Sequence, residues 1–205
     1  MQQDSATKID IEAISPSPLM AALQAIHGQY ADNFSGKVAT YIPELAKANS
    51  KLFGIALVTA DGYSYEVGDA SHPFTIQSIS KPFVYGLALE DHGEDYVLTK
   101  VGVEPTGEAF NSIVFDERHN RPFNPMVNAG AIATTALVKG ETPERRLARV
   151  LKKFTDLAGR CLAIDHDVYL SECKTGHRNR AIGYLELNAG MIDAQVDEHL
   201  DLYFK

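Results

Sequence analysis

Hydrophobic residues follow helical spacing near the start of the chain and strand-like spacing soon afterwards. Ser17-Pro18 is a typical helix start, with an N-cap residue followed by proline. The apolar face of the helix that follows consists of Leu19, Leu23, Ile26 and Tyr30. The runs 52–59 and 63–67 are β-prone and flank Asp61-Gly62, which favours a tight turn. The pattern therefore predicts one helix followed by a β-hairpin.

Beyond residue 80 the spacing is mostly helical. Three further helices are expected at 83–93, 126–138 and 142–159, with a last one from Val196 to Phe204, while 104–125 is loop-like. The order of elements predicts an α/β (α+β) fold in which helices pack on an antiparallel sheet, interrupted by a helical subdomain. We expect a tail at 1–16, a sheet and nucleophile part at about 17–81, and a mostly helical part at about 82–205.

Composition narrows the class of protein. The chain has 205 residues, of which 45% are hydrophobic and 22% charged, as in a globular protein with a sizeable core. A net charge of −8 disfavours nucleic acid or an anionic membrane as a partner. The two cysteines, Cys161 and Cys173, form no disulfide framework, and the polar N-terminus has no secretory pattern. A cytoplasmic protein is expected.

Ser78-Ile79-Ser80-Lys81 is the strongest sign of chemistry. A serine and a lysine three residues apart share one face of a helical turn, where the neutral amine can act as a base for the hydroxyl. The β-prone run Phe74–Gln77 precedes it, so we expect Ser78 at a strand-to-helix junction. Pro82 cannot donate to the carbonyl of Ser78, so the first turn must be frayed or tightened. Ser80, next to Lys81, points away from it.

Other polar clusters have structural explanations that compete with functional ones. Asn128 can present its amide to a substrate, or it can cap the helix that it begins. Glu172 and Asn179 read as a solvated polar loop when taken alone. Asp165-His166-Asp167 reads as a turn, and no histidine pair with metal-ligand spacing occurs, so no catalytic metal is expected. Lys174-Thr175-Gly176 follows no strand pattern, and we interpret it as a coincidence.

Several motifs taken together are far more specific than any one of them. In chain order they are Tyr41-Ile42-Pro43-Glu44-Leu45-Ala46, Ile76 to Lys81, Glu104-Pro105-Thr106-Gly107, Asn124 to Ile132, and Glu172 through Asn179 to Tyr184. This set resembles the serine-dependent glutaminase family, whose catalytic domain looks like that of serine β-lactamases. The resemblance runs from about Ser17 to the last residue.

The resemblance implies hydrolysis of L-glutamine to L-glutamate and ammonia without a cofactor, in a homo-oligomer. By position, Ser78 matches the nucleophile and Lys81 the general base. The positions that match the substrate pocket are Tyr41, Gln77, Asn128, Glu172, Asn179 and Tyr203. Glu172 is then the candidate partner of the α-ammonium, and the amides and tyrosines are candidates for the α-carboxylate.

Two alternatives stay open at this point. One is another serine acyl-transfer enzyme with a Ser-x-x-Lys motif, acting on a lactam or a peptide, and the other is a non-catalytic fragment. Family members continue past residue 205 with a second tyrosine, a Lys-Ser-Gly strand and a valine that helps form the oxyanion hole. We therefore expect these 205 residues alone to turn over glutamine weakly, because one oxyanion donor contributes about 3–4 kcal/mol to lowering the barrier.

Overall fold

The computed structural model describes residues 17–205, so the predicted tail at 1–16 lies outside the described residues. An antiparallel pair of strands and a set of helices give an α+β fold, as predicted. The chain divides into two compact units. The first comprises residues 17–38 and Ala48–Phe74, and the second comprises Ala39–Lys47 and Thr75–Lys205.

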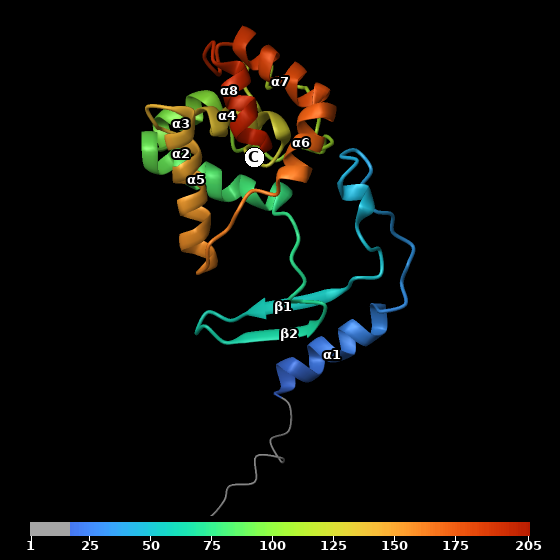
Figure 1. Ribbon diagram of the computed structural model, residues 1–205. Helices are drawn as coiled ribbons and strands as arrows, with labels where there is room; N and C mark the ends of the chain where they lie inside the picture. The colour runs from blue at the N-terminus through green and yellow to red at the C-terminus, as the bar shows by residue number, and fades with distance from the viewer. Residues whose placement is uncertain (1–16) are drawn as a thin grey trace, which may run out of the picture. The chain divides into compact units, whose positions relative to one another are not determined.

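The first unit is one helix and one hairpin. Helix α1 (Pro18–Tyr30) begins where expected, because the Ser17 hydroxyl accepts a hydrogen bond from the Met20 amide at 3.1 Å. Strands β1 (Gly54–Val58) and β2 (Ser64–Gly68) pair antiparallel, and Gly62 supplies the positive φ that the turn needs. Helix α1 lies along this hairpin (Figure 1). The predicted helix and hairpin are confirmed.

The second unit is helical. Its elements are the 3-10 turns η2 (Leu45–Lys47) and η3 (Gln77–Ser80) and the helices α2 (Lys81–His92), α3 (Glu94–Lys100), α4 (Asn128–Ala136), α5 (Pro143–Ala158), α6 (His166–Thr175), α7 (His177–Asn188) and α8 (Val196–Phe204). Helix α4 is buried along most of its length and contacts α2, α3, α7 and α8. Its small residues allow this close packing, and the largest core cluster joins α4 to α7 and α8.

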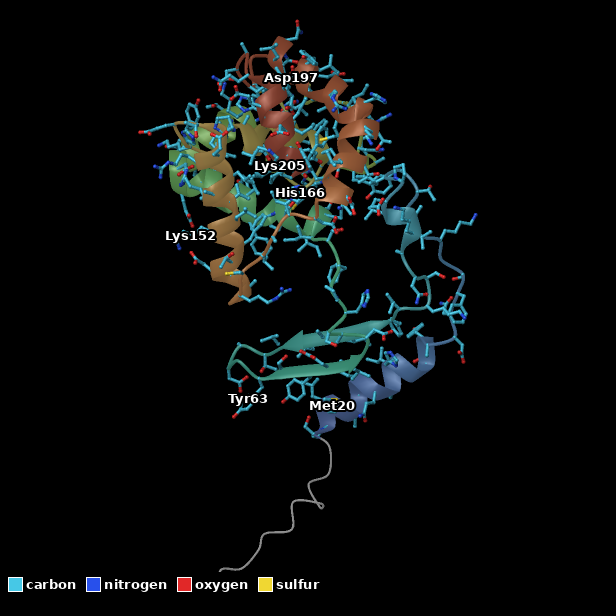
Figure 2. The ribbon with its side chains drawn as sticks, viewed as in Figure 1. Met20, Tyr63, Lys152, His166, Asp197 and Lys205 are labelled. Carbon is cyan, nitrogen blue, oxygen red and sulfur yellow. The ribbon has the colours of Figure 1, made fainter. Side chains whose placement is uncertain are left out.

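Helix α5 is attached to α2 by charged groups. The Arg149 guanidinium donates to both carboxylate oxygens of Asp91, at 2.6 and 2.7 Å. Helix α5 begins at the predicted cap, where the Thr142 hydroxyl accepts from the Arg145 amide, and it ends at Gly159 in the left-handed conformation. Lys152 projects from the exposed side of this helix (Figure 2).

Three local predictions were wrong. Phe74–Gln77 is not a strand: Gln77 has a φ of 45° and begins η3, a conformation that a strand excludes. Asp165 is not in a turn, because its carboxylate accepts from the Asp167 and Val168 amides and caps α6. The third wrong prediction is the polar loop: Glu172 lies on helix α6 and Asn179 on helix α7. Lys174-Thr175-Gly176 ends α6, consistent with a coincidental match.

The boundary between the two units also differs from the expected one. The sequence placed residues 17–81 together, whereas the first unit ends at Phe74 and the segment Thr75–Lys81 belongs to the helical unit. Within the described part of the chain, no helix is long and apolar enough to cross a membrane. The same residues contain no cluster of metal-ligating side chains.

Candidate active site

Ser78 lies in the 3-10 turn η3 that leads directly into α2. Its side chain is exposed. The Lys81 amide donates to the Ser78 carbonyl, and this tightened turn is the one predicted from Pro82. Gln77, just before the serine, has a φ of 45°, which costs a non-glycine residue about 1–3 kcal/mol. A strained residue immediately before an exposed serine is typical of a turn that presents a nucleophile.

Lys81 is the buried cationic group of this region, with a relative exposure of 5%. Its Nζ donates to the carbonyl of Met126 at 3.0 Å and to Asn128 Oδ1 at 2.7 Å. The Phe110 ring lies 5.9 Å from the same nitrogen. Burial lowers the pKa of Lys81 from 10.5 to about 8. A neutral amine has two N–H groups and one lone pair, so both hydrogen bonds persist after deprotonation and the lone pair stays available.

Asn128 connects Lys81 to the next helix. It is buried, and its Nδ2 donates to Asn179 Oδ1 at 3.0 Å. Val127, not Asn128, is the N-cap of α4, so the capping role considered for Asn128 is not found. Within the same motif, a Cβ on Gly130 would lie 1.9 Å from the Asn124 carbonyl oxygen. Glycine at that position is therefore needed for the Asn124 loop to lie against α4.

Glu172, Tyr203 and Tyr41 form a second group of predicted site residues. Burial raises the pKa of the Glu172 carboxyl to about 7, and no described residue donates a hydrogen bond to its side chain. Burial also raises the pKa of Tyr203, and the charges of Glu172 and Tyr41 act in the same direction. Tyr41 has an exposed side chain. A half-buried carboxyl without a partner is suited to pairing with a cation.

All the predicted site residues lie in the second unit, including Tyr41 on the segment Ala39–Lys47. That segment is attached to α6 by the Glu44 amide, which donates to Ser171 Oγ at 3.1 Å. Hydrogen bonds bring Lys81, Asn128 and Asn179 together directly. Gln77 donates to Thr75 Oγ1 at 3.2 Å. Within residues 17–205, no hydrogen bond joins Ser78 Oγ to Lys81 Nζ.

Two contacts of the site were not predicted. The Met126 carbonyl accepts from Lys81, and the Phe110 carbonyl accepts from the Asn128 amide at 2.8 Å. Both act through the backbone, so their side chains give no sequence signal. The motif Asn124-Pro125-Met126-Val127-Asn128 indicated that the segment carrying Met126 belongs to the site. It did not indicate that the Met126 carbonyl accepts a hydrogen bond from Lys81.

The comparisons with known proteins agree on one family. A family model described as Glutaminase matches residues 36–205. The chain is 59% identical over 202 residues to a glutaminase of Trichormus variabilis, covering 98% of this chain and 60% of the relative. It is 52% identical over 188 residues to glutaminase 2 of Bradyrhizobium diazoefficiens, covering 92% of this chain and 30% of that one. The chain thus spans about three-fifths or less of these curated relatives.

Solved structures lead to the same group. A probable glutaminase matches with a TM-score of 0.87 at 40% identity, covering 93% of this chain and 62% of that one. A crystal structure of Mglu in its glutamate form matches with a TM-score of 0.86 at 37% identity, covering 93% and 44%.

Proposed function

The chain belongs to the glutaminase family, and on that premise we propose that its Ser78–Lys81 site hydrolyses L-glutamine to L-glutamate and ammonia. One observation supports this proposal above the others. Lys81 is buried, has its pKa lowered to about 8, and lies three residues after an exposed serine. A lysine base must lose its proton near neutral pH, and burial beside uncharged acceptors favours the neutral amine.

The proposed reaction has two steps. The Lys81 amine takes the proton of Ser78 Oγ, which attacks the side-chain carbonyl carbon of glutamine. The C–N bond then breaks, and the nitrogen takes the proton from Lys81 and leaves as ammonia. Water next attacks the Ser78 ester with Lys81 again accepting a proton, and glutamate is released as Lys81 returns that proton to Ser78.

Recognition of the amino-acid head group is proposed for the second group of residues. The α-ammonium of glutamine needs an anion, and Glu172 is a carboxyl that lacks a partner in the described chain. The α-carboxylate needs donors, which Asn179, Asn128 and the Tyr203 and Tyr41 phenols supply. Gln77, adjacent to the nucleophile, is proposed as a further contact to the substrate.

Further properties follow from the family by analogy. We propose a serine nucleophile on a β-lactamase-like fold, no cofactor, a cytoplasmic location and a homo-oligomeric state.

Covalent labelling tests the proposed nucleophile. A diazoketone analogue of glutamine should add its mass to the peptide that carries Ser78, and Ser78→Ala should not be labelled. Ser80→Ala is the matched control, because the Ser80 hydroxyl donates to the Gln77 carbonyl at 2.8 Å and should not react. Labelling of another peptide, or undiminished glutamine turnover in Ser78→Ala or Lys81→Ala, would refute the assignment.

A further inference from the structure

Arg146 is a buried cation outside the proposed site. It lies on α5 with a relative exposure of 6%. Its Nε donates to the Val138 carbonyl at 3.0 Å, and its NH2 donates to the Thr135 and Ala136 carbonyls at 2.9 and 3.3 Å. These carbonyls belong to the last turn of α4 and the residues just after it. Arg146 therefore satisfies the C-terminal carbonyls of α4, where a positive charge is favoured.

Arg146 also fixes the proton position on His199. His199, on α8, has a relative exposure of 2%, and its Nδ1 lies 3.0 Å from Arg146 NH1. Arginine can only donate, so Nδ1 accepts and the ring proton sits on Nε2. Nε2 then donates to Asp193 Oδ1 at 2.7 Å. The hydrogen bonds among Arg146, His199 and Asp193, which we call the relay, require a neutral imidazole.

The relay connects two of the helices that carry the proposed site. Arg146 holds the end of α4, whose first residue is Asn128, and His199 lies one helical turn before Tyr203 on α8. Figure 2 shows Asp197 and Lys205 at the two ends of α8. Helix α8 contacts α4, α5, α6 and α7, so any displacement of α8 changes the position of Tyr203 relative to Asn128.

Three charged groups that act on His199 determine what a proton would do there. Arg146 faces it from α5, Asp193 from the loop before α8, and Glu198 is its neighbour on α8. Helix α4 has no titratable side chain. Burial lowers the pKa of His199 and the Arg146 charge adds to this, while Asp193 and Glu198 oppose it. Protonation would place a hydrogen on Nδ1 directly opposite the guanidinium and break that hydrogen bond.

We propose that Arg146 and His199 are positioning residues that hold α8 against the end of α4 while the imidazole is neutral and release it when the imidazole is protonated. The inference rests on the proposed function only in taking Tyr203 and Asn128 as parts of one site. Acid would then separate the head-group residues from the Lys81 network, in addition to protonating Glu172 and Lys81 themselves.

A cavity of about 520 Å³ gives small solutes access to the relay. Arg146, Asp193 and His199 all line it, together with His92, Tyr96 and Lys100. Removing the imidazole of His199 would enlarge a space that is already open, and free imidazole has the shape and both nitrogens needed to replace it. Rescue by added imidazole is therefore a feasible test.

The test reads the positions of Tyr203 and Asn128 rather than turnover, so it stands even if the glutaminase proposal fails. Fluorotyrosine at Tyr203, assigned with Tyr203→Phe, and the side-chain amide of Asn128 are followed by NMR as the pH is lowered. In the wild type both signals should shift together at a pH below the ordinary histidine value of 6.5. In His199→Gln, whose amide can accept from Arg146 and donate to Asp193, the signals should match those of the wild type at neutral pH and lack the joint shift below pH 6.5. Changes near pH 7 and 8, from titration of Glu172 and Lys81, should be the same in both proteins.

His199→Ala should displace both signals at neutral pH, and imidazole should restore them. His166→Gln, at an exposed position on α6, is the matched control and should titrate like the wild type. A joint shift of both signals below pH 6.5 that persists in His199→Gln would overturn the proposal. So would wild-type signals in a folded His199→Ala variant at neutral pH. Should His199→Ala not fold, the comparison of wild type with His199→Gln decides alone.

Discussion

Lys81 Nζ donates a 2.7 Å hydrogen bond to Asn128 Oδ1, which joins the first residue of α2 to the first residue of α4. The acceptor is an uncharged amide, although an aspartate of nearly the same shape would pair more strongly with an ammonium. A neutral acceptor leaves the lysine with a lowered pKa, which is the state that a base requires.

Asn128→Asp should therefore raise the pKa of Lys81 from about 8 towards its ordinary value. Glutamine turnover in the wild type should rise with pH through about 8, because only the neutral amine can take the serine proton. In the variant this rise should move to higher pH, and turnover near neutrality should fall. The pH dependence of kcat/KM for both proteins measures the displacement. Asn120→Asp, at an exposed loop position, should leave the profile unchanged.

Glu172→Gln should weaken binding of amino-acid ligands by about 1–3 kcal/mol, because a charge-assisted hydrogen bond becomes a neutral one. The pKa of Glu172 is raised to about 7, and only the ionised form pairs with an ammonium. Affinity of the wild type for L-glutamate should accordingly fall as the pH drops through about 7. Calorimetric titration at several pH values measures both effects.

A ligand without the α-amine provides the control for Glu172. It should bind wild type and Glu172→Gln about equally, and the same loss for both ligands would show that the residue has a structural role instead.

We expect the native Glu186 side chain to lower the free energy of unfolding of this protein. It is fully buried on α7, neither carboxylate oxygen has a hydrogen-bond partner in the described chain, and burial raises its pKa well above 4.5. Glu186→Leu should increase the free energy of unfolding by about 1–3 kcal/mol, since an unpaired polar group leaves the core. Urea denaturation of both proteins measures the gain.

The gain from Glu186→Leu should depend on pH. The folded protein keeps a proton on Glu186 that the unfolded chain releases above 4.5, so this residue makes the wild type less stable as the pH rises. The advantage of the leucine variant should therefore be larger at pH 8 than at pH 5. Glu108→Leu, in an exposed loop, is the control, and an equal gain there would attribute the effect to hydrophobicity in general.

The backbone at Gln77 predicts an unusual order of substitutions. Glycine adopts a positive φ without strain, whereas a β-branched residue does so at high cost. Gln77→Val should lower the melting temperature, and Gln77→Gly should hold or raise it. Thermal unfolding followed by circular dichroism gives the ranking, and a glycine variant less stable than the valine variant would contradict it.

The helix starts and the hairpin turn were predictable from sequence, because residues within a few positions of each one determine it. Ser17 and Thr142 cap helices through hydroxyls that accept from amides three residues later, and Gly62 turns the hairpin with its positive φ. Each of these effects is contained within a few residues of chain. Periodicity and cap chemistry are sufficient for such cases.

The remaining features depend on partners far along the chain. The side chain of Asn128 looked like a cap but serves Lys81, 47 positions earlier. Nothing near Gln77 in sequence indicates its positive φ, and its β-prone neighbours predicted a strand. The burial of Glu186 follows from the packing of α7 on α4 and α8, which periodicity alone does not reveal.

The attachment of Ala39–Lys47 to α6 has a consequence for the order of folding. The Glu44 amide and its acceptor Ser171 are separated by 127 positions, so a ribosome releases the donor long before the acceptor exists. Helices that form from local contacts can assemble first, because closing so long a loop costs entropy before any contact repays it. Tyr41 travels on this segment. Tyr41 should therefore reach its final position in the proposed site only after α6 has left the ribosome, although it is synthesised before the other site residues.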